Sequence, residues 1–356
     1  MKTVFRIGDH LEIVHHEKNT IIADHKNFRY IKMKDSKYLR FIENNLKDGM
    51  TNTELREETL AGKLSWDLMS KMIERLIELE ILTKVEWPES GRTEPSNLGQ
   101  ADLFNGRFIH EIEALSFYEI HGISRFHAFE RIRNGKVAIV GVGGVGSNVA
   151  VMLTAAGIGS IILVDEDNVE ESNLVRQVFY ESVDCGKTKK VVALKHFLNK
   201  FSPYTEVYAI DHYVQTITDA EKYLHDVDVI IQTADTPRGV INRIINDYST
   251  NSGCASIYCA NGTVGPFFIP GRSGSFRDFE EYLNRETNGI YDLFVEIKNK
   301  ETSRAAPSEV GGPWLAAYYL YNEIVDYFAG IQKLKTENAI IKLSDGGFGV
   351  EVLSFK

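Results

Sequence analysis

The stretch KVAIVGVGGVGSNVAVMLTAA, residues 136–156, decides the fold of this chain. Its first residues form an apolar run that predicts a buried strand, and a helix is predicted over residues 147–156. Between them lie Gly141, Gly143, Gly144 and Gly146. Glycines let backbone N–H groups approach a phosphate, and a helix N-terminus adds positive potential. The stretch therefore predicts a nucleotide-binding unit; close packing of strand on helix is the alternative use of the glycines.

Strands and helices alternate after this stretch. Apolar runs at residues 161–167, 206–210 and 228–235 predict strands, and a helix is predicted over residues 189–201. This alternation is typical of an α/β fold with a doubly wound, mostly parallel, Rossmann-like sheet. Asp165 ends the second strand, where a carboxylate can accept hydrogen bonds from both hydroxyls of a ribose.

Charged and amide side chains that suit a triphosphate follow the second strand. Arg176 and Lys189 can neutralise the charge that builds as pyrophosphate leaves the α-phosphate. Asp235 ends the strand DVIIQTAD and is a candidate Mg²⁺ ligand, because Mg²⁺ often takes one or two carboxylates plus phosphate oxygens. Side chains that can orient these groups or bind ribose and phosphate are Asp167, Asn173 and Gln177. A hydride-transfer enzyme has no use for the two cations, so the pattern favours ATP over NAD.

Composition excludes several classes of protein. The chain has 356 residues, a net charge of −10 and three cysteines. The acidic balance argues against nucleic acid and anionic membranes as partners. Three cysteines cannot form a disulfide framework, and the first residues contain no apolar signal-peptide core. We expect a cytoplasmic protein that does not span a membrane.

The ordered motifs resemble those of the ThiF/MoeB-like adenylating enzymes, relatives of the ubiquitin-activating enzymes. GVGGVGS, DEDNVEESNLVRQ, the Gly-x-x-Lys at residues 186–189 and the Ala-Asp of QTAD carry the resemblance. The resemblance implies ATP and Mg²⁺ as cofactors, a carboxyl-adenylate as product and a homodimer. It also implies that Asp165 holds the ribose and that Asp235 binds Mg²⁺. The residues that it assigns to the phosphates are Asn173, Arg176, Gln177 and Lys189.

Domain boundaries follow from changes in composition. Residues 1–87 combine short β-like runs with three helical stretches and resemble a winged-helix module. Residues 88–102 are rich in Pro, Gly and Ser and predict a linker. Residues 103–356 form the ThiF-like domain, in which the charged residues 271–304 are expected to be an irregular excursion.

The first module indicates which carboxylate is activated. A winged-helix-like module before a ThiF-like domain resembles the microcin-type and pantocin-type enzymes, which modify ribosomally made precursor peptides in antibiotic biosynthesis. In such modules a leader peptide adds to the sheet edge beside the third helix. We expect the leader near residues 28–33 (Phe28 to Met33) and 65–79 (Ser65 to Leu79). The alternatives are activation of a ubiquitin-like sulfur-carrier protein and a catalytically inactive protein that binds nucleotide and peptide.

Two departures from the family pattern stand out. Many members hold a structural zinc with paired CxxC motifs, whereas this chain has Ser275-Phe276-Arg277-Asp278 at the position of the first pair, so we expect no structural zinc. The family arginine upstream of the glycine loop is also absent. Arg125 lies near that position and is a candidate substitute. Cys254 and Cys259 fall in an apolar run typical of buried thiols.

Overall fold

The computed structural model describes residues 2–8, 10–25, 27–47, 49–87, 106–237, 239–260, 262–299, 310–343 and 350–355. Residue contacts divide the chain into two units. Unit 1 is Met1–Arg131 with Ala329–Ile331, and unit 2 is Ile132–Phe328 with Gln332–Lys356. The predicted linker, residues 88–102, lies outside the described residues.

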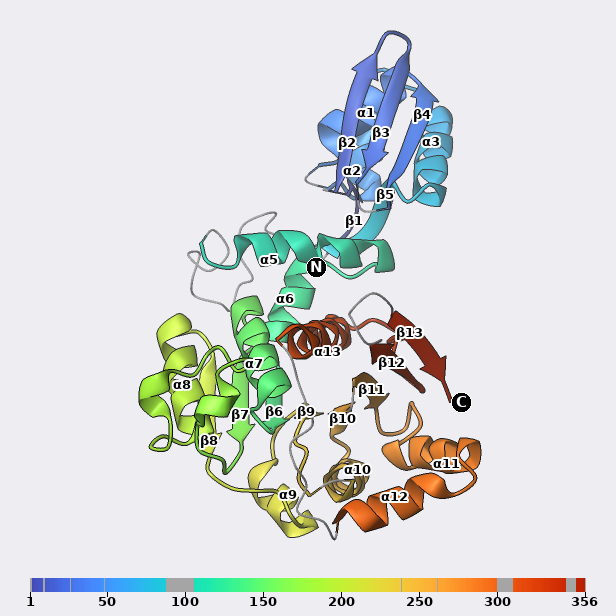
Figure 1. The fold of residues 1–356 in the computed structure, drawn as a ribbon. Helices are drawn as coiled ribbons and strands as arrows, with labels where there is room; N and C mark the ends of the chain where they lie inside the picture. The colour runs from blue at the N-terminus through green and yellow to red at the C-terminus, as the bar shows by residue number, and fades with distance from the viewer. Residues whose placement is uncertain are drawn as a thin grey trace. The chain divides into compact units, whose positions relative to one another are not determined.

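Unit 2 is built on an eight-stranded sheet with the order β13-β12-β11-β10-β9-β6-β7-β8. The pairs along β10-β9-β6-β7-β8 are parallel, and β11, β12 and β13 extend the sheet by antiparallel pairs (Figure 1). The strands are β6 (Lys136–Val140), β7 (Ser160–Val164), β8 (Glu206–Ile210), β9 (Val229–Gln232), β10 (Ala255–Ala260), β11 (Thr263–Phe268), β12 (Ala339–Leu343) and β13 (Val350–Ser354). The predicted α/β fold with a mostly parallel sheet is confirmed.

Helices flank this sheet because its central strands are apolar on both faces, as in β9, whose four residues are all buried. The helices are α7 (Gly144–Ala156), α8 (Lys190–Phe201), α9 (Ile217–Tyr223), α10 (Val240–Ser252), α11 (Phe276–Glu286), α12 (Ile290–Asn299) and α13 (Gly311–Ala329), with short 3₁₀ helices η2 (Glu171–Asn173) and η3 (Ser182–Asp184). Helix α7 begins at Gly144, earlier than predicted, because the last glycines of the loop adopt helical geometry after Gly143.

The expectation of an irregular excursion over residues 271–304 is wrong for most of its length. Helices α11 and α12 occupy it as far as Asn299 and pack with α10 (Figure 1). Ser275 and Asp278 form a capping box that starts α11. Its apolar face buries Phe276 and Phe279. Arg277, Glu281, Arg285 and Glu286 lie at the surface, whereas Glu280 is 5% exposed. The charge content of this stretch therefore hid helices with a buried apolar face.

Helix α13 carries a carboxylate inside unit 2. Glu323 is 1% exposed, and its side chain accepts hydrogen bonds from the backbone N–H and hydroxyl of Thr336, at 2.9 and 2.5 Å. Burial raises the pKa of Glu323, whereas the bonds from Thr336 oppose the rise. The helix is therefore tied to the segment before β12 by a buried polar contact.

The described residues up to Trp87 in unit 1 form two small antiparallel sheets and three helices. Strands β2 (Leu11–His16), β3 (Asn19–Asp24) and β4 (Arg29–Lys34) form one sheet, and β1 (Lys2–Ile7) pairs with β5 (Leu82–Trp87). The helices are α1 (Lys37–Asn45), α2 (Asn52–Ala61) and α3 (Trp66–Glu78). Their core includes Ile22, Leu39, Leu55 and Met69. The buried face of α3 is formed by Met69, Ile73 and Leu76, and Leu68 is exposed.

A helical segment follows, made of α5 (Ile109–Ala114), η1 (Leu115–His121) and α6 (Arg125–Asn134). Its residues up to Arg131 belong to unit 1. Gly122, with φ of 78°, ends η1. No helix in the described ranges has the length and apolar character needed to cross a membrane.

Candidate nucleotide-binding site

The glycine loop connects β6 to α7 at the carboxyl end of the parallel sheet. Gly141 has φ of 87°, and a Cβ there would lie 2.6 Å from the backbone nitrogen of Ala234. A Cβ on Gly146 would lie 1.9 Å from the carbonyl oxygen of Gly141. Neither position accepts a side chain. The backbone of the loop thus packs against the residues after β9, where Asp235 lies.

Two buried acceptor atoms beside the loop have no hydrogen-bond partner within the described structure. They are Oδ1 of Asn148 and Oε1 of Gln177. The other end of the Asn148 amide donates to the carbonyl oxygen of Gly144 at 2.6 Å, so this side chain is oriented by the loop. Buried acceptors without donors are rare, and a bound ligand or water is the usual explanation. The loop therefore has the properties of a site for a polar ligand.

Asp165 lies at the end of β7 and bonds to the glycine loop itself. Its carboxylate accepts the backbone N–H of Val142 at 2.9 Å and that of Asp167 at 2.8 Å. The side chain is 8% exposed, and burial raises its pKa, which the charge of Lys190 opposes. The residue predicted to hold ribose thus also orients the loop.

Arg176 and Gln177 lie against the loop from the segment after η2. If Gly144 carried a Cβ atom, that atom would lie 3.6 Å from Cδ of Arg176. A Cβ atom on Gly143 would lie 3.8 Å from Nε2 of Gln177. Asn173 is buried and accepts the backbone N–H of Glu170, so its carbonyl oxygen is used in the turn. The structure brings Arg176 and Gln177 to the glycine loop and gives Asn173 a structural contact.

Lys189 lies just before α8, on the side of β8. Its ammonium donates to the carbonyl oxygen of Glu166 at 2.6 Å and lies 3.2 Å from the carboxylate of Asp211. About a third of the side chain is exposed. Lys189 thus lies beside the acidic loop after β7.

Asp235 follows β9 and is exposed. In the described part of the chain, no three His, Cys, Asp or Glu side chains form a group that could hold a metal ion. Magnesium, however, commonly binds one or two carboxylates together with substrate phosphates, so a single carboxylate beside the glycine loop fits the ion if a nucleotide binds there.

Arg125, the candidate substitute for the upstream arginine, is buried in unit 1. Its guanidinium donates to Glu119 at 2.8 Å through Nε. Arg6 donates to the same carboxylate at 2.6 Å. Both cations and the acid are at most 6% exposed. Arg125 is therefore part of a buried ion cluster in this structure.

The cysteines have little thiolate character. Burial raises the pKa of both Cys254 and Cys259 to about 12. The pKa of Cys185 is also raised, by its local desolvation and by Glu171. All three are free thiols. At the position of the first family CxxC, Ser275 and Asp278 cap α11.

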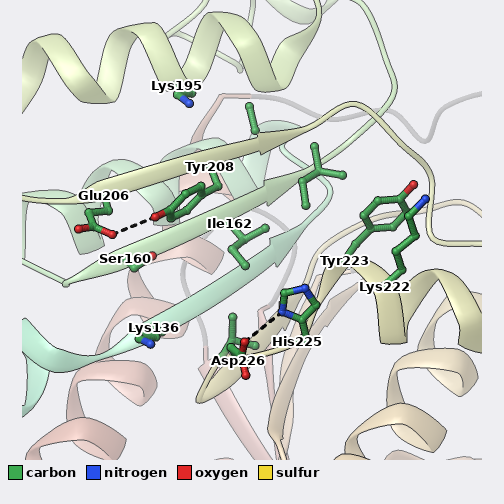
Figure 2. A pocket seen from close by; sticks show the side chains of 13 residues that line it. Lys136, Ser160, Ile162, Lys195, Glu206, Tyr208, Lys222, Tyr223, His225 and Asp226 are labelled. Carbon is green, nitrogen blue, oxygen red and sulfur yellow. Dashed lines mark hydrogen bonds and ion pairs between the residues drawn. The ribbon is translucent and has the colours of Figure 1, made fainter.

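A pocket of about 500 Å³ opens elsewhere in unit 2 (Figure 2). Lys136, Ser160 and Glu206 line it and are the first residues of β6, β7 and β8. In Figure 2 the Tyr208 hydroxyl bonds to Glu206. Open α/β sheets bind ligands outside the carboxyl ends of their strands, so this pocket is separate from the candidate site.

Sequence reasoning missed several residues that shape the site. The hydroxyl of Tyr180 is buried and donates to the carbonyl oxygen of Val142 at 2.6 Å. Lys190 donates to Asp167 at 2.7 Å, and Tyr213 donates to the other oxygen of the same carboxylate. Tyr180 and Lys190 stand within or beside the quoted motifs, but their contacts depend on folding. Tyr213 carries no sequence signal of its own.

Residues 119–340 match the model of the ThiF family. The chain is 32% identical over 196 residues to ubiquitin-like modifier-activating enzyme 5 of Drosophila ananassae, covering 51% of this chain and 49% of that protein. It is 35% identical over 123 residues to adenylyltransferase and sulfurtransferase UBA4 of Kluyveromyces lactis, covering 35% of this chain and 27% of that protein. The chain thus spans half the length of these curated relatives or less.

Solved structures match over nearly the whole chain. E. coli MccB with ATP has a TM-score of 0.71 and 20% identity, covering 99% of this chain and 97% of that one. The microcin C7 biosynthetic enzyme MccB in complex with N-formylated MccA has a TM-score of 0.72 and 20% identity, and the match covers 99% of this chain and 97% of that one. At this identity the likeness concerns the fold.

Proposed function

Because this chain belongs to the ThiF family, we propose that it uses ATP and Mg²⁺ to adenylate a carboxylate on a ribosomally synthesised precursor peptide. The observation that carries the proposal is the extent of the structural match. MccB, a microcin C7 biosynthetic enzyme solved with ATP and with N-formylated MccA, matches 99% of the chain, including unit 1. The curated relatives match at most about half of it.

The reaction requires alignment and charge neutralisation rather than a general base. A carboxylate oxygen attacks the α-phosphate, forming a P–O bond while the bond to the β-phosphate breaks and pyrophosphate leaves. In the proposal, the glycine loop holds the phosphates and Asp165 holds the ribose. Arg176 and Lys189 offset the charge on the leaving pyrophosphate. Asp235 would hold Mg²⁺ together with phosphate oxygens, and the ion would supply further positive charge.

Unit 1 supplies the surface for the leader peptide in this proposal. Among the strands that the structure describes, β4 pairs with β3 alone and is an edge strand. Arg29 on β4 donates to the carbonyl oxygen of Leu79, at the end of α3, at 2.8 Å. Phe28 and Tyr30 are 90% and 73% exposed. An open strand edge beside a helix, with exposed aromatic side chains, fits a peptide that adds as a further strand.

A homodimer in a reducing cytoplasmic compartment is part of the proposal. All three cysteines are free thiols, which fits such a compartment. Large apolar side chains are exposed in the segments around the glycine loop, among them Val175, Val178 and Tyr318, and such residues fit an interface. Light scattering of the purified protein should give twice the mass of one chain; a monomeric mass would contradict the dimer.

The direct test is exchange of radioactive pyrophosphate into ATP. Peptides encoded by short reading frames beside the gene should support exchange, and mass spectrometry of the product should show addition of AMP or loss of water. A protein that binds ATP but exchanges pyrophosphate with none of these peptides would contradict the proposal.

The names of the curated relatives favour a second candidate, activation of a ubiquitin-like protein. The same assay separates the two. Exchange that depends on a ubiquitin-like protein from the same genome, and on no peptide, would favour this candidate.

A further inference from the structure

Asp167 is held by side chains from two different elements. Lys190 is the first residue of α8 and is 6% exposed, and its ammonium donates to Oδ2 of Asp167 at 2.7 Å. Tyr213 follows β8, and its hydroxyl donates to Oδ1. Burial alone would raise the pKa of Asp167, but the bonds from Lys190 and Tyr213 lower it below its usual value. The carboxylate is therefore fixed on both oxygens.

This contact extends to the glycine loop. The backbone N–H of Asp167 donates to Oδ1 of Asp165 at 2.8 Å, and Oδ2 of Asp165 accepts the N–H of Val142 at 2.9 Å. A continuous set of hydrogen bonds thus leads from α8 and the segment after β8 to the loop that would receive the phosphates. Each bond involves a carboxylate and is among the stronger kind.

We infer that Lys190 and Tyr213 are positioning residues for the nucleotide: they fix Asp167 and, through its backbone, the Asp165 carboxylate. The inference rests on the proposed nucleotide site. It adds to the Gly-x-x-Lys motif, whose lysine is Lys189. Lys190, the next residue, is buried, and its ammonium contacts Asp167.

Electrostatics gives the inference a measurable signature. The charged or titratable groups around Asp165 are Asp167, Tyr180, Lys190 and Tyr213. Burial raises the pKa of Asp165, and Lys190 is the cation that opposes this rise. Without Lys190, Asp165 would become protonated at a higher pH. Nucleotide affinity that needs the carboxylate would then be lost earlier as the pH falls.

The experiment measures the affinity for Mg²⁺-ATP by titration calorimetry, without any acceptor peptide, near neutral pH and about one pH unit lower. Lys190→Met should weaken binding about tenfold near neutrality, as expected for a lost charge-assisted bond, and more at the lower pH. Lys190→Arg should restore most of the affinity. Tyr213→Phe should weaken binding about threefold, because a second donor remains on Asp167. Lys187→Met, an exposed neighbour, is the matched control.

Wild-type affinity for ATP in Lys190→Met at both pH values would overturn the inference. A loss that is equal at both pH values and is not rescued by arginine would also overturn it, since a purely structural role predicts that result. If Lys190→Met does not fold, wild-type affinity in Tyr213→Phe would overturn the inference, since that variant is expected to bind about threefold more weakly. Because no acceptor is present, failure of pyrophosphate exchange remains a separate result that concerns the proposed function alone.

Discussion

At the scale of single residues, buried polar side chains at the carboxyl ends of the parallel strands hold the backbone of the glycine loop. Asp165 is buried and yet is expected to act as a carboxylate, and its two oxygens already accept backbone N–H groups. Tyr180 holds the carbonyl of the same residue, Val142, whose N–H bonds to Asp165. The loop is therefore oriented before any ligand binds, which lowers the entropy cost of binding.

Arg176→Ala and Asp235→Ala are each expected to reduce pyrophosphate exchange about a hundredfold, because each removes charge stabilisation from the transition state. Asp226→Ala is the matched control, since this exposed carboxylate lies before β9, at the opposite end of the strand from Asp235. Exchange within about threefold of wild type in both site variants would contradict the assignment.

The hydrogen bond from the Tyr180 hydroxyl to the carbonyl oxygen of Val142 can be tested by substitution. Tyr180→Phe leaves the carbonyl of Val142 without its buried donor, which costs about 1–3 kcal/mol. We expect a lower melting temperature and a smaller rise on adding Mg²⁺-ATP, both measured by calorimetry. A variant that gains as much stability from ATP as wild type would show that the bond has no effect on the loop's affinity.

At the scale of elements, β4 exposes backbone groups at a sheet edge, whereas α13 buries a charged side chain. Strand β4 has one edge without a partner among the described strands, and an open edge is a hazard for aggregation unless a partner uses it. Helix α13 instead buries an acidic side chain among backbone donors. The open edge of β4 suits recognition of a peptide, and the buried contact of α13 suits stabilisation of the fold.

Tyr30→Ala is expected to weaken binding of the leader peptide about tenfold, since exposed aromatic side chains often dominate such interfaces. Affinity for ATP should not change, as measured by calorimetry. Val14→Ala on β2, the opposite edge of the same sheet, is the matched control. An equal loss in the two variants would exclude β4 as the specific docking edge.

Glu323→Gln tests the buried acid of α13. Because its folded pKa is raised by burial, the protonated form favours folding, and this stability is lost as the pH rises above about 4.5 through the folded pKa. The glutamine variant should therefore gain stability relative to wild type as the pH rises through this range, measured by urea unfolding. A constant difference at all pH values would contradict the argument.

At the scale of the whole molecule, unit 1 extends beyond the N-terminal strands and helices to the segment before β6. Arg6 on β1 and Arg125 on α6 share the carboxylate of Glu119 on η1, and all three are buried. The cluster joins the first strand of the chain to helices more than a hundred residues later. The segment before β6 thus belongs structurally with the N-terminal strands.

Glu119→Ala should destabilise the protein by about 3–5 kcal/mol, because it leaves two buried guanidinium groups without their carboxylate. Urea unfolding measures the change. The triple variant Arg6→Met, Glu119→Leu, Arg125→Met should recover much of it, since no buried charge remains. A single variant within about 1 kcal/mol of wild type would show that the cluster is well solvated.

The sequence alone determined the parallel sheet, the glycine loop and the order of the acidic and basic residues after it. These features are local: an apolar run predicts a strand, and residues at the ends of consecutive parallel strands must meet at one edge. The helices of residues 276–299 were missed because charge content hid an amphipathic pattern. Only the tertiary structure decided which side chains hold Asp167 and Val142 and that Arg125 pairs with Glu119. These contacts join separate elements, and burial, which decides their strength, is a property of the folded chain.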